Sequence, residues 1–168
     1  MLAPAIAVMP SLTECKLRGN TLGIKGWTEI LNALRNSPTS KITTWDLSYE
    51  GLGPDIAKPL AEYLSVTASL TSVSLLANQF DDETVAMLLK LKEEKPTLTT
   101  LCGLKPDQTE VELSLKKLGP QDAKLLAPEI SVMPSLTKLD IQYIELGEEG
   151  EAVLRKAVEG RSGFELVL

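Results

Sequence analysis

Hydrophobic residues recur along the chain in a fixed order. Each copy of the pattern has hydrophobic residues at its first, fourth, sixth and eleventh positions, with mainly polar residues between them. Copies begin at Leu12, Ile42, Leu70 and Leu136, and an incomplete copy begins at Leu98. Because side chains alternate between the two faces of a strand, the fourth and sixth positions point to the same side. The pattern therefore predicts one short, half-buried strand in each copy.

A second hydrophobic pattern follows the predicted strands and has helical spacing. After Gly23, Gly53 and Gly119, apolar residues stand four, seven, eight and eleven positions later. This spacing places them on one stripe of an amphipathic helix. The three stripes are Trp27, Ile30, Leu31, Leu34; Ala57, Leu60, Ala61, Leu64; and Ala123, Leu126, Ala127, Ile130. Alternating strands and helices predict an α/β fold.

One part of the repeat is nearly duplicated. Leu2–Thr13 reads LAPAIAVMPSLT and Leu126–Thr137 reads LAPEISVMPSLT, so ten of the twelve positions are identical. The first copy places the start of the sequence at the end of a helix, which suggests a piece of a longer array. At the other end, Phe164–Leu168 predicts a closing strand.

The full pattern resembles the leucine-rich-repeat motif L-x-x-L-x-L-x-x-N-x-L, and its period of about 28 residues resembles the ribonuclease-inhibitor-like subtype. The resemblance implies a curved horseshoe solenoid, with parallel strands on the concave face and helices on the convex face. It covers residues 1–168 as a single domain of about five to six repeats, one of them truncated.

The ninth position of the motif is occupied unevenly. In the family, an asparagine there binds backbone groups at the turn and forms a ladder. Asn20 and Asn78 occupy this position here, whereas Glu50, Lys116 and Ile144 depart from the motif. A glutamate can still accept hydrogen bonds, but a lysine cannot accept them and an isoleucine side chain cannot bond at all. The ladder is therefore expected to be imperfect.

The repeat is irregular at about 98–110. A unit begins at Leu98, but residues 102–107 have no helical pattern, and the next strand pattern begins at Val111. Either a tight extended crossover joins two parallel strands, or residues 102–110 form a loop or hairpin that bulges from the solenoid. The repeat context favours the crossover. The irregularity is interpreted as a deletion scar, with a functional insertion as the alternative.

Composition limits the possible partners and locations. The net charge is −6 and the pI is about 4.8, which argues against nucleic-acid binding and mildly favours a basic partner. No hydrophobic run reaches the roughly 18 residues that a membrane span needs. Two cysteines in the chain do not suggest a disulfide framework, so an intracellular, cytoplasmic location is predicted.

Little in the sequence indicates catalysis. The chain has no histidine, which excludes a Ser-His-Asp triad, a Cys-His dyad and histidine-based metal sites. Phosphate-loop and EF-hand motifs are also missing from the sequence. Glu110 and Glu112 could imitate a catalytic carboxylate pair, but a solvated acidic patch is favoured because no pocket is implied. We therefore expect no enzyme activity, no cofactor and no metal.

The candidate site is the predicted concave face. Residues at the third, fifth, seventh and eighth positions should point outward, and the chosen partner-binding candidates are Lys16, Arg18, Asp46, Tyr49, Glu110, Glu112, Asp140 and Tyr143. The acidic members could form a groove for a basic peptide, and the tyrosines could anchor a contact. Cys102 should also face this side, whereas Trp27, Trp45 and Cys15 are assigned to the core.

The predicted function is protein binding through the concave face. One alternative is a structural segment of a longer repeat scaffold. Another is regulation of a small GTPase, because some arrays of this subtype resemble GTPase-activating proteins. The chain is expected to be a monomer, or to associate weakly end to end through the apolar Met1–Val8.

Overall fold

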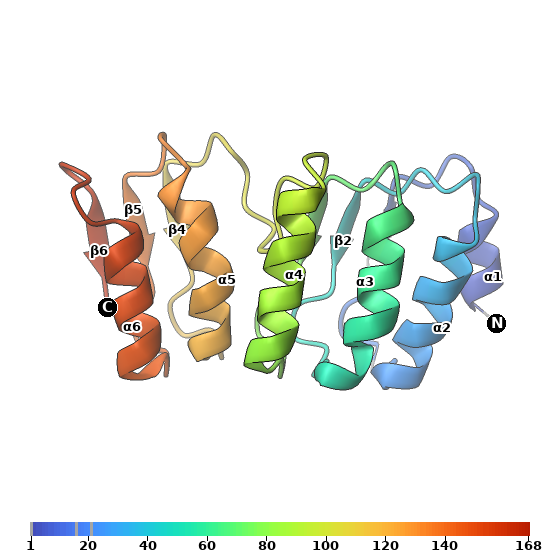
Figure 1. Ribbon diagram of the computed structural model, residues 1–168, viewed down its shortest axis with the longest axis horizontal. Helices are drawn as coiled ribbons and strands as arrows, with labels where there is room; N and C mark the ends of the chain where they lie inside the picture. Colours follow the sequence, from blue (N-terminus) through green and yellow to red (C-terminus); the bar gives the residue numbers. More distant parts are fainter. Residues whose placement is uncertain (1, 16, 21) are drawn as a thin grey trace. The chain divides into compact units, whose positions relative to one another are not determined.

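The computed structural model describes residues 2–15, 17–20 and 22–168. The chain divides into two compact units, Met1–Gly103 and Leu104–Leu168, which we call unit 1 and unit 2. Each unit is built from alternating helices and parallel strands (Figure 1). The boundary between the units lies inside the region where the sequence pattern is irregular.

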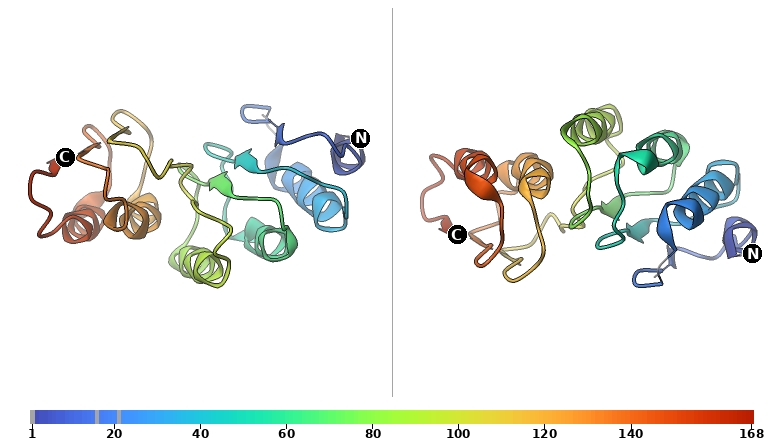
Figure 2. Two further views of the ribbon diagram at one scale, coloured as in Figure 1. Left: turned by 90° about the horizontal axis from the view of Figure 1, so that it is seen from above. Right: turned by 90° about the horizontal axis from the view of Figure 1, so that it is seen from below.

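Unit 1 contains a parallel three-stranded sheet with the strand order β1-β2-β3. Its elements are α1 (Leu2–Ala7), β1 (Glu14–Cys15), α2 (Gly23–Arg35), β2 (Thr44–Asp46), the 3-10 helix η1 (Pro54–Ile56), α3 (Ala57–Val66), β3 (Ser72–Ser74) and α4 (Asp82–Glu94). Two isolated bridges, from Thr100 to Ser72 and from Cys102 to Ser74, extend the sheet beyond β3. Helices α2, α3 and α4 lie on one side of these strands (Figure 2).

Unit 2 contains a second parallel sheet, with the strand order β4-β5-β6. Its elements are β4 (Glu110–Glu112), α5 (Pro120–Ser131), β5 (Lys138–Asp140), α6 (Gly147–Ala157) and β6 (Glu165–Val167). Helices α5 and α6 pack against each other. Strand β6 confirms the predicted closing strand. The α/β class and the parallel strands are also confirmed, while the continuous horseshoe, the single domain and the number of repeats stay predictions.

Burial along the strands follows the predicted alternation. The fourth-position side chains Trp45, Val73, Val111 and Leu139 are buried. The residues on either side of each are partly or fully exposed. One face of each strand therefore supplies the core and the other face remains accessible.

The predicted helical stripes also supply the core. All stripe residues of α2 and α5 are buried: Trp27, Ile30, Leu31, Leu34, Ala123, Leu126, Ala127 and Ile130. Trp27 packs edge-on against Trp45, with ring centroids 5.9 Å apart and planes at 84°. Trp45 also donates its indole N–H to the Tyr63 hydroxyl at 3.1 Å. Both tryptophans are core residues, as predicted.

Threonine occupies the second position of every repeat of the sequence pattern, at Thr13, Thr43, Thr71, Thr99, Thr109 and Thr137. In unit 1, Thr43 donates its backbone N–H and its hydroxyl to the Thr13 carbonyl, at 2.9 and 3.2 Å. Thr71 and Thr99 repeat this contact with the preceding threonine. Thr137 repeats it with Thr109 in unit 2. This ladder at the start of the strands was not predicted, although the recurrence is visible in the sequence.

The ninth position forms hydrogen bonds between neighbouring repeats. The Asn78 amide donates to the Leu47 and Leu75 carbonyls at 2.9 and 2.8 Å, and its oxygen accepts the Leu52 N–H at 3.0 Å. Glu50 accepts the Gly19 N–H at 2.7 Å and the Trp27 indole N–H at 3.0 Å. The expectation that a glutamate can serve at this position is therefore confirmed.

The irregular region links the last bridges of unit 1 to β4 of unit 2. Thr100 and Cys102 bridge to β3 in unit 1, whereas β4 belongs to the separate sheet of unit 2. Residues 103–109 form no helix or strand. Two hydrogen bonds between Lys105 and Gln108, at 2.7 and 3.1 Å, close a turn there. The extended crossover between parallel strands stays a prediction.

Among the described residues, no helix combines the length and hydrophobicity that crossing a bilayer would require. Neither Cys15 nor Cys102 forms a disulfide.

Candidate functional site

Each unit has one sheet face that its helices leave uncovered. The third and fifth positions of the repeat point to this face, which we call the strand face. In unit 1 it carries Glu14, Thr44, Asp46, Ser72 and Ser74. In unit 2 it carries Glu110, Glu112, Lys138, Asp140 and Glu165. All of these side chains are partly or fully exposed, which makes the two strand faces the candidate interaction surfaces.

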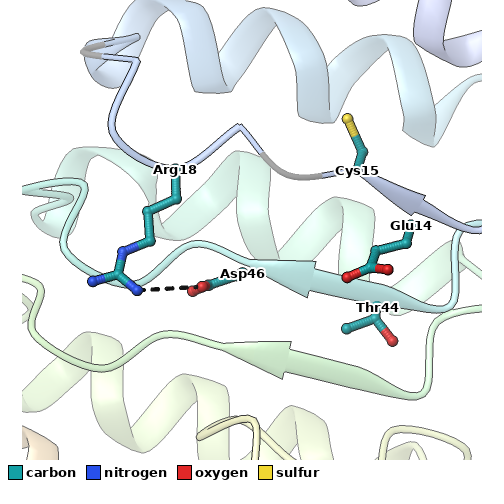
Figure 3. Close-up of a pocket in the computed structure, with 5 residues that line it drawn as sticks. All are labelled: Glu14, Cys15, Arg18, Thr44 and Asp46. Carbon is teal, nitrogen blue, oxygen red and sulfur yellow. Dashed lines mark ion pairs between the residues drawn. The ribbon is translucent and has the colours of Figure 1, made fainter.

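The strand face of unit 1 has a hollow of about 260 Å³ lined by Glu14, Cys15, Arg18, Thr44 and Asp46 (Figure 3). The Arg18 guanidinium lies 3.6 Å from the Asp46 carboxylate and 4.4 Å from the centroid of the Tyr49 ring. The structure thus brings together three of the predicted site residues. Both members of the ion pair are nearly half exposed, so it contributes at most about 1 kcal/mol to folding.

The sequence also assigned Lys16 and Cys102 to the open face and Cys15 to the core. Lys16 lies outside the residues that the structure describes. Cys15 is only partly buried, and its sulfur points away from Glu14 and the ion pair (Figure 3). Burial raises the pKa of the Cys15 thiol, which disfavours the reactive thiolate. Cys102, which the sequence assigned to the open side, is buried.

The acidic candidates take part in local hydrogen bonds at the ends of their strands. Asp46 accepts the Ser48 N–H at 3.0 Å and the Ser48 hydroxyl at 2.6 Å. Glu112 accepts the Ser114 N–H at 2.9 Å, and Asp140 accepts the Gln142 N–H at 3.1 Å. These carboxylates therefore have a structural role in addition to their predicted role in binding a partner. A test of binding must remove their charge while keeping an oxygen acceptor.

Unit 2 gathers the other acidic candidates on one strand face. Glu110 lies opposite Lys138 in the ladder, and Glu112 lies opposite Asp140. Lys138 also approaches the Glu165 carboxylate at 3.7 Å. The face therefore holds four carboxylates and one ammonium group, and it is acidic as the sequence predicted.

Local contacts favour the ionised form of Glu112. The Ser114 hydroxyl and then its N–H lower the pKa of this carboxyl, with smaller contributions from Lys138 and Lys116. Glu112 therefore stays charged at neutral pH, which preserves the acidity of the strand face.

After β2, β3, β4 and β5 the chain passes through a residue in the left-handed region. This residue occupies the eighth position of the repeat, and its φ is 60° at Tyr49 and 58° at Ala77, Leu115 and Tyr143. Tyr143, a predicted contact residue, is 80% exposed, and Leu115 is 77% exposed. Leu115 was not predicted as a site residue. It occupies the eighth, outward position of the repeat that begins at Gln108, so the register that gave Glu110 and Glu112 could have found it.

No cluster of three or more potential metal-ligating Cys, Asp or Glu side chains occurs within the part of the chain that the structure describes.

Comparisons with known proteins add little to this picture. No protein-family model matches the sequence, and no curated protein matches it. Among solved structures, the chain is similar to the tropomodulin C-terminal domain from Caenorhabditis elegans, with a TM-score of 0.49 and 17% sequence identity. The match covers 89% of this chain and 84% of that chain. A likeness at this level supports no inference about function.

Proposed function

We propose that this protein is a non-catalytic protein-interaction module of the leucine-rich-repeat type, which binds a protein partner through its strand faces. The observation that carries the proposal is the one-sided cover of the sheets. Helices pack on one face of each sheet, and the other face presents accessible charged and polar side chains. A scaffold of this kind uses its regular core to hold a recognition surface in place.

The chemistry of unit 2 favours a partner with a basic surface. Four carboxylates and one ammonium group lie on its strand face, and Glu110 and Glu112 are exposed. Complementary charge increases the association rate and excludes acidic competitors. Partner binding should therefore weaken as the salt concentration rises, because exposed charges are screened.

The direct test is capture of partners from a cell lysate by the native chain and by the variant Glu110→Gln, Glu112→Gln, Asp140→Asn. These substitutions remove three charges and retain side-chain oxygens that can accept the Ser114 and Gln142 N–H bonds. We expect the variant to fold normally and to lose the partner that the native chain retains, as identified by mass spectrometry.

A matched control changes the same number of charges away from the strand face. The variant Glu148→Gln, Glu151→Gln, Glu159→Gln alters residues in and just after α6. It should retain the partner. Equal retention by both variants would exclude the strand face of unit 2 as the binding surface.

A further inference from the structure

Unit 2 exposes two large side chains at neighbouring positions next to its acidic strand face. Leu115 and Tyr143 are 77% and 80% exposed. The Leu115 N–H donates to the Gln142 carbonyl at 3.1 Å, which places Leu115 beside the residue that precedes Tyr143. The pair therefore lies where the chain leaves β4 and β5. We call these two residues the apolar pair.

The backbone at the apolar pair is unfavourable for the residues it carries. Both residues have a φ of 58°, in the left-handed region. This conformation costs a residue with a side chain roughly 1 kcal/mol, and Gly or Asn accepts it more readily. Because both side chains are mostly exposed, burial offsets little of this cost. The fold alone does not account for a leucine and a tyrosine at these positions.

The same position of the repeat is occupied differently in unit 1. Gly19 has a φ of 80° and Ala77 is small. The larger Tyr49 ring is covered by the Arg18 guanidinium at 4.4 Å and is only partly exposed. Unit 1 thus uses small or covered residues where unit 2 presents uncovered ones. This difference separates the apolar pair from a general property of the repeat.

The charges on the two sides of Leu115 differ in sign, whereas the chain beyond Tyr143 carries the exposed Glu145. The strand face of unit 2 leads to the pair and is acidic, with four carboxylates and one ammonium group. Directly after Leu115 come Lys116 and Lys117, both exposed. A ligand that covers the pair and runs along the strands would therefore need basic residues on the strand side.

We propose that the apolar pair is the anchor of a docking site for a partner segment in which basic residues adjoin an apolar or aromatic residue. The apolar residue packs on Leu115 and Tyr143, and the basic residues lie over Glu110, Glu112 and Asp140. This inference rests on the proposed binding function and specifies the chemistry of the partner. Tyrosine is suited to such an anchor because it offers a large rigid surface at an interface.

The first test uses three synthetic peptides and amide NMR spectra of the full chain. The probes are acetyl-Lys-Lys-Phe-amide, acetyl-Lys-Lys-Gly-amide and acetyl-Glu-Glu-Phe-amide. We expect the first to shift the amides of Leu115, Lys116 and Tyr143 and to bind about fivefold more tightly than the glycine peptide. The acidic peptide should not bind. Equal binding of the phenylalanine and glycine peptides, or no shifts at the apolar pair at millimolar peptide, would overturn the anchor.

The second test uses the variant Leu115→Asn, Tyr143→Asn. Asparagine tolerates the left-handed conformation, so the variant should melt at or above the temperature of the native chain. It should bind acetyl-Lys-Lys-Phe-amide about fivefold more weakly than the native chain does. Val132→Asn is the control. Val132 is also mostly exposed, at 74%, but it lies between the end of α5 and the start of β5, whereas the apolar pair follows the ends of β4 and β5. A lower melting temperature for the double variant would indicate a structural role and contradict the proposal.

The captured partner separates this inference from the proposed function. One outcome is that the Leu115→Asn, Tyr143→Asn variant retains the partner while the charge-neutralised strand-face variant loses it. That result would show that the apolar pair is not the anchor, and it would leave partner binding through the strand face supported. If both variants retain the partner, the proposed strand-face function fails as well. Loss of the partner by both variants supports both proposals.

Discussion

The two near-identical segments Leu2–Thr13 and Leu126–Thr137 have the same local structure in different surroundings. In both, a helix ends at equivalent residues, and Met9 and Met133 donate to the Ile6 and Ile130 carbonyls at 3.4 Å. Their burial differs. Leu2 is 45% exposed and its counterpart Leu126 is fully buried, while Met9 is 46% exposed and Met133 only 7%.

The two segments also differ in how their helix ends are stabilised. In unit 2, Arg161 donates from its guanidinium to the Ile130, Met133 and Leu136 carbonyls. In unit 1 the equivalent residue is Ser37, which donates one hydroxyl bond to the Ala7 carbonyl. A positive charge at the carboxyl end of a helix also interacts favourably with its dipole. Local sequence therefore determines the turn, while residues about one repeat away determine how strongly it is held.

The largest expected difference concerns burial. Leu126→Ala should lower the free energy of unfolding by about 3 kcal/mol, because it leaves a cavity in the core. Leu2→Ala should lower it by less than about 1 kcal/mol, because nearly half of that side chain already contacts solvent. Urea unfolding of both variants measures the difference. Equal losses of unfolding free energy in the two variants would contradict the difference in burial between the two segments.

A smaller difference is expected for the helix ends. Arg161→Met should cost about 2 kcal/mol of unfolding free energy, because three carbonyls lose a charged donor. Ser37→Ala should cost about 1 kcal/mol, because only one carbonyl is affected. Thermal unfolding of the paired variants provides the comparison. A loss for Ser37→Ala that matches or exceeds the loss for Arg161→Met would refute the assigned difference.

The smallest effect is the titration of Glu112, whose hydrogen bonds are local. Its pKa lies below the ordinary value of 4.5 because Ser114 binds the carboxylate. The ionised group therefore stabilises the fold above the unfolded-state pKa, and this contribution is lost as the pH falls through the folded-state pKa. Carbon-13 NMR should show the lowered pKa in the native chain and, unchanged, in Arg161→Met. A return to 4.5 in that variant would mean that the bond depends on distant residues.

The elements of the fold could be predicted because local spacing specifies them. The stripe from Trp27 to Leu34 and the strand positions around Trp45 follow periods that are visible within one repeat. The Arg161 contacts could not be predicted in this way, because they join residues 25 or more positions apart. The short link before β4 could not be predicted in this way either, because the repeat pattern breaks there.

The candidate site was predicted in part. Arg18, Asp46 and Tyr49 lie together as a group, and Glu110, Glu112 and Asp140 share one strand face. Sequence spacing did not reveal the hydrogen bonds of the carboxylates, because alternation gives the direction of a side chain but not its partner. Leu115 occupies an outward position of the repeat that begins at Gln108, but it was missed because the candidates were limited to charged and tyrosine side chains.

The most direct test of the account is hydrogen–deuterium exchange of the full chain with and without its captured partner. We expect the partner to slow exchange in residues 110–116 and 138–144, which include strand-face residues and the apolar pair. Exchange in α5 and α6 should change little. Protection confined to these helices, with none in 110–116 or 138–144, would contradict binding through the strand face.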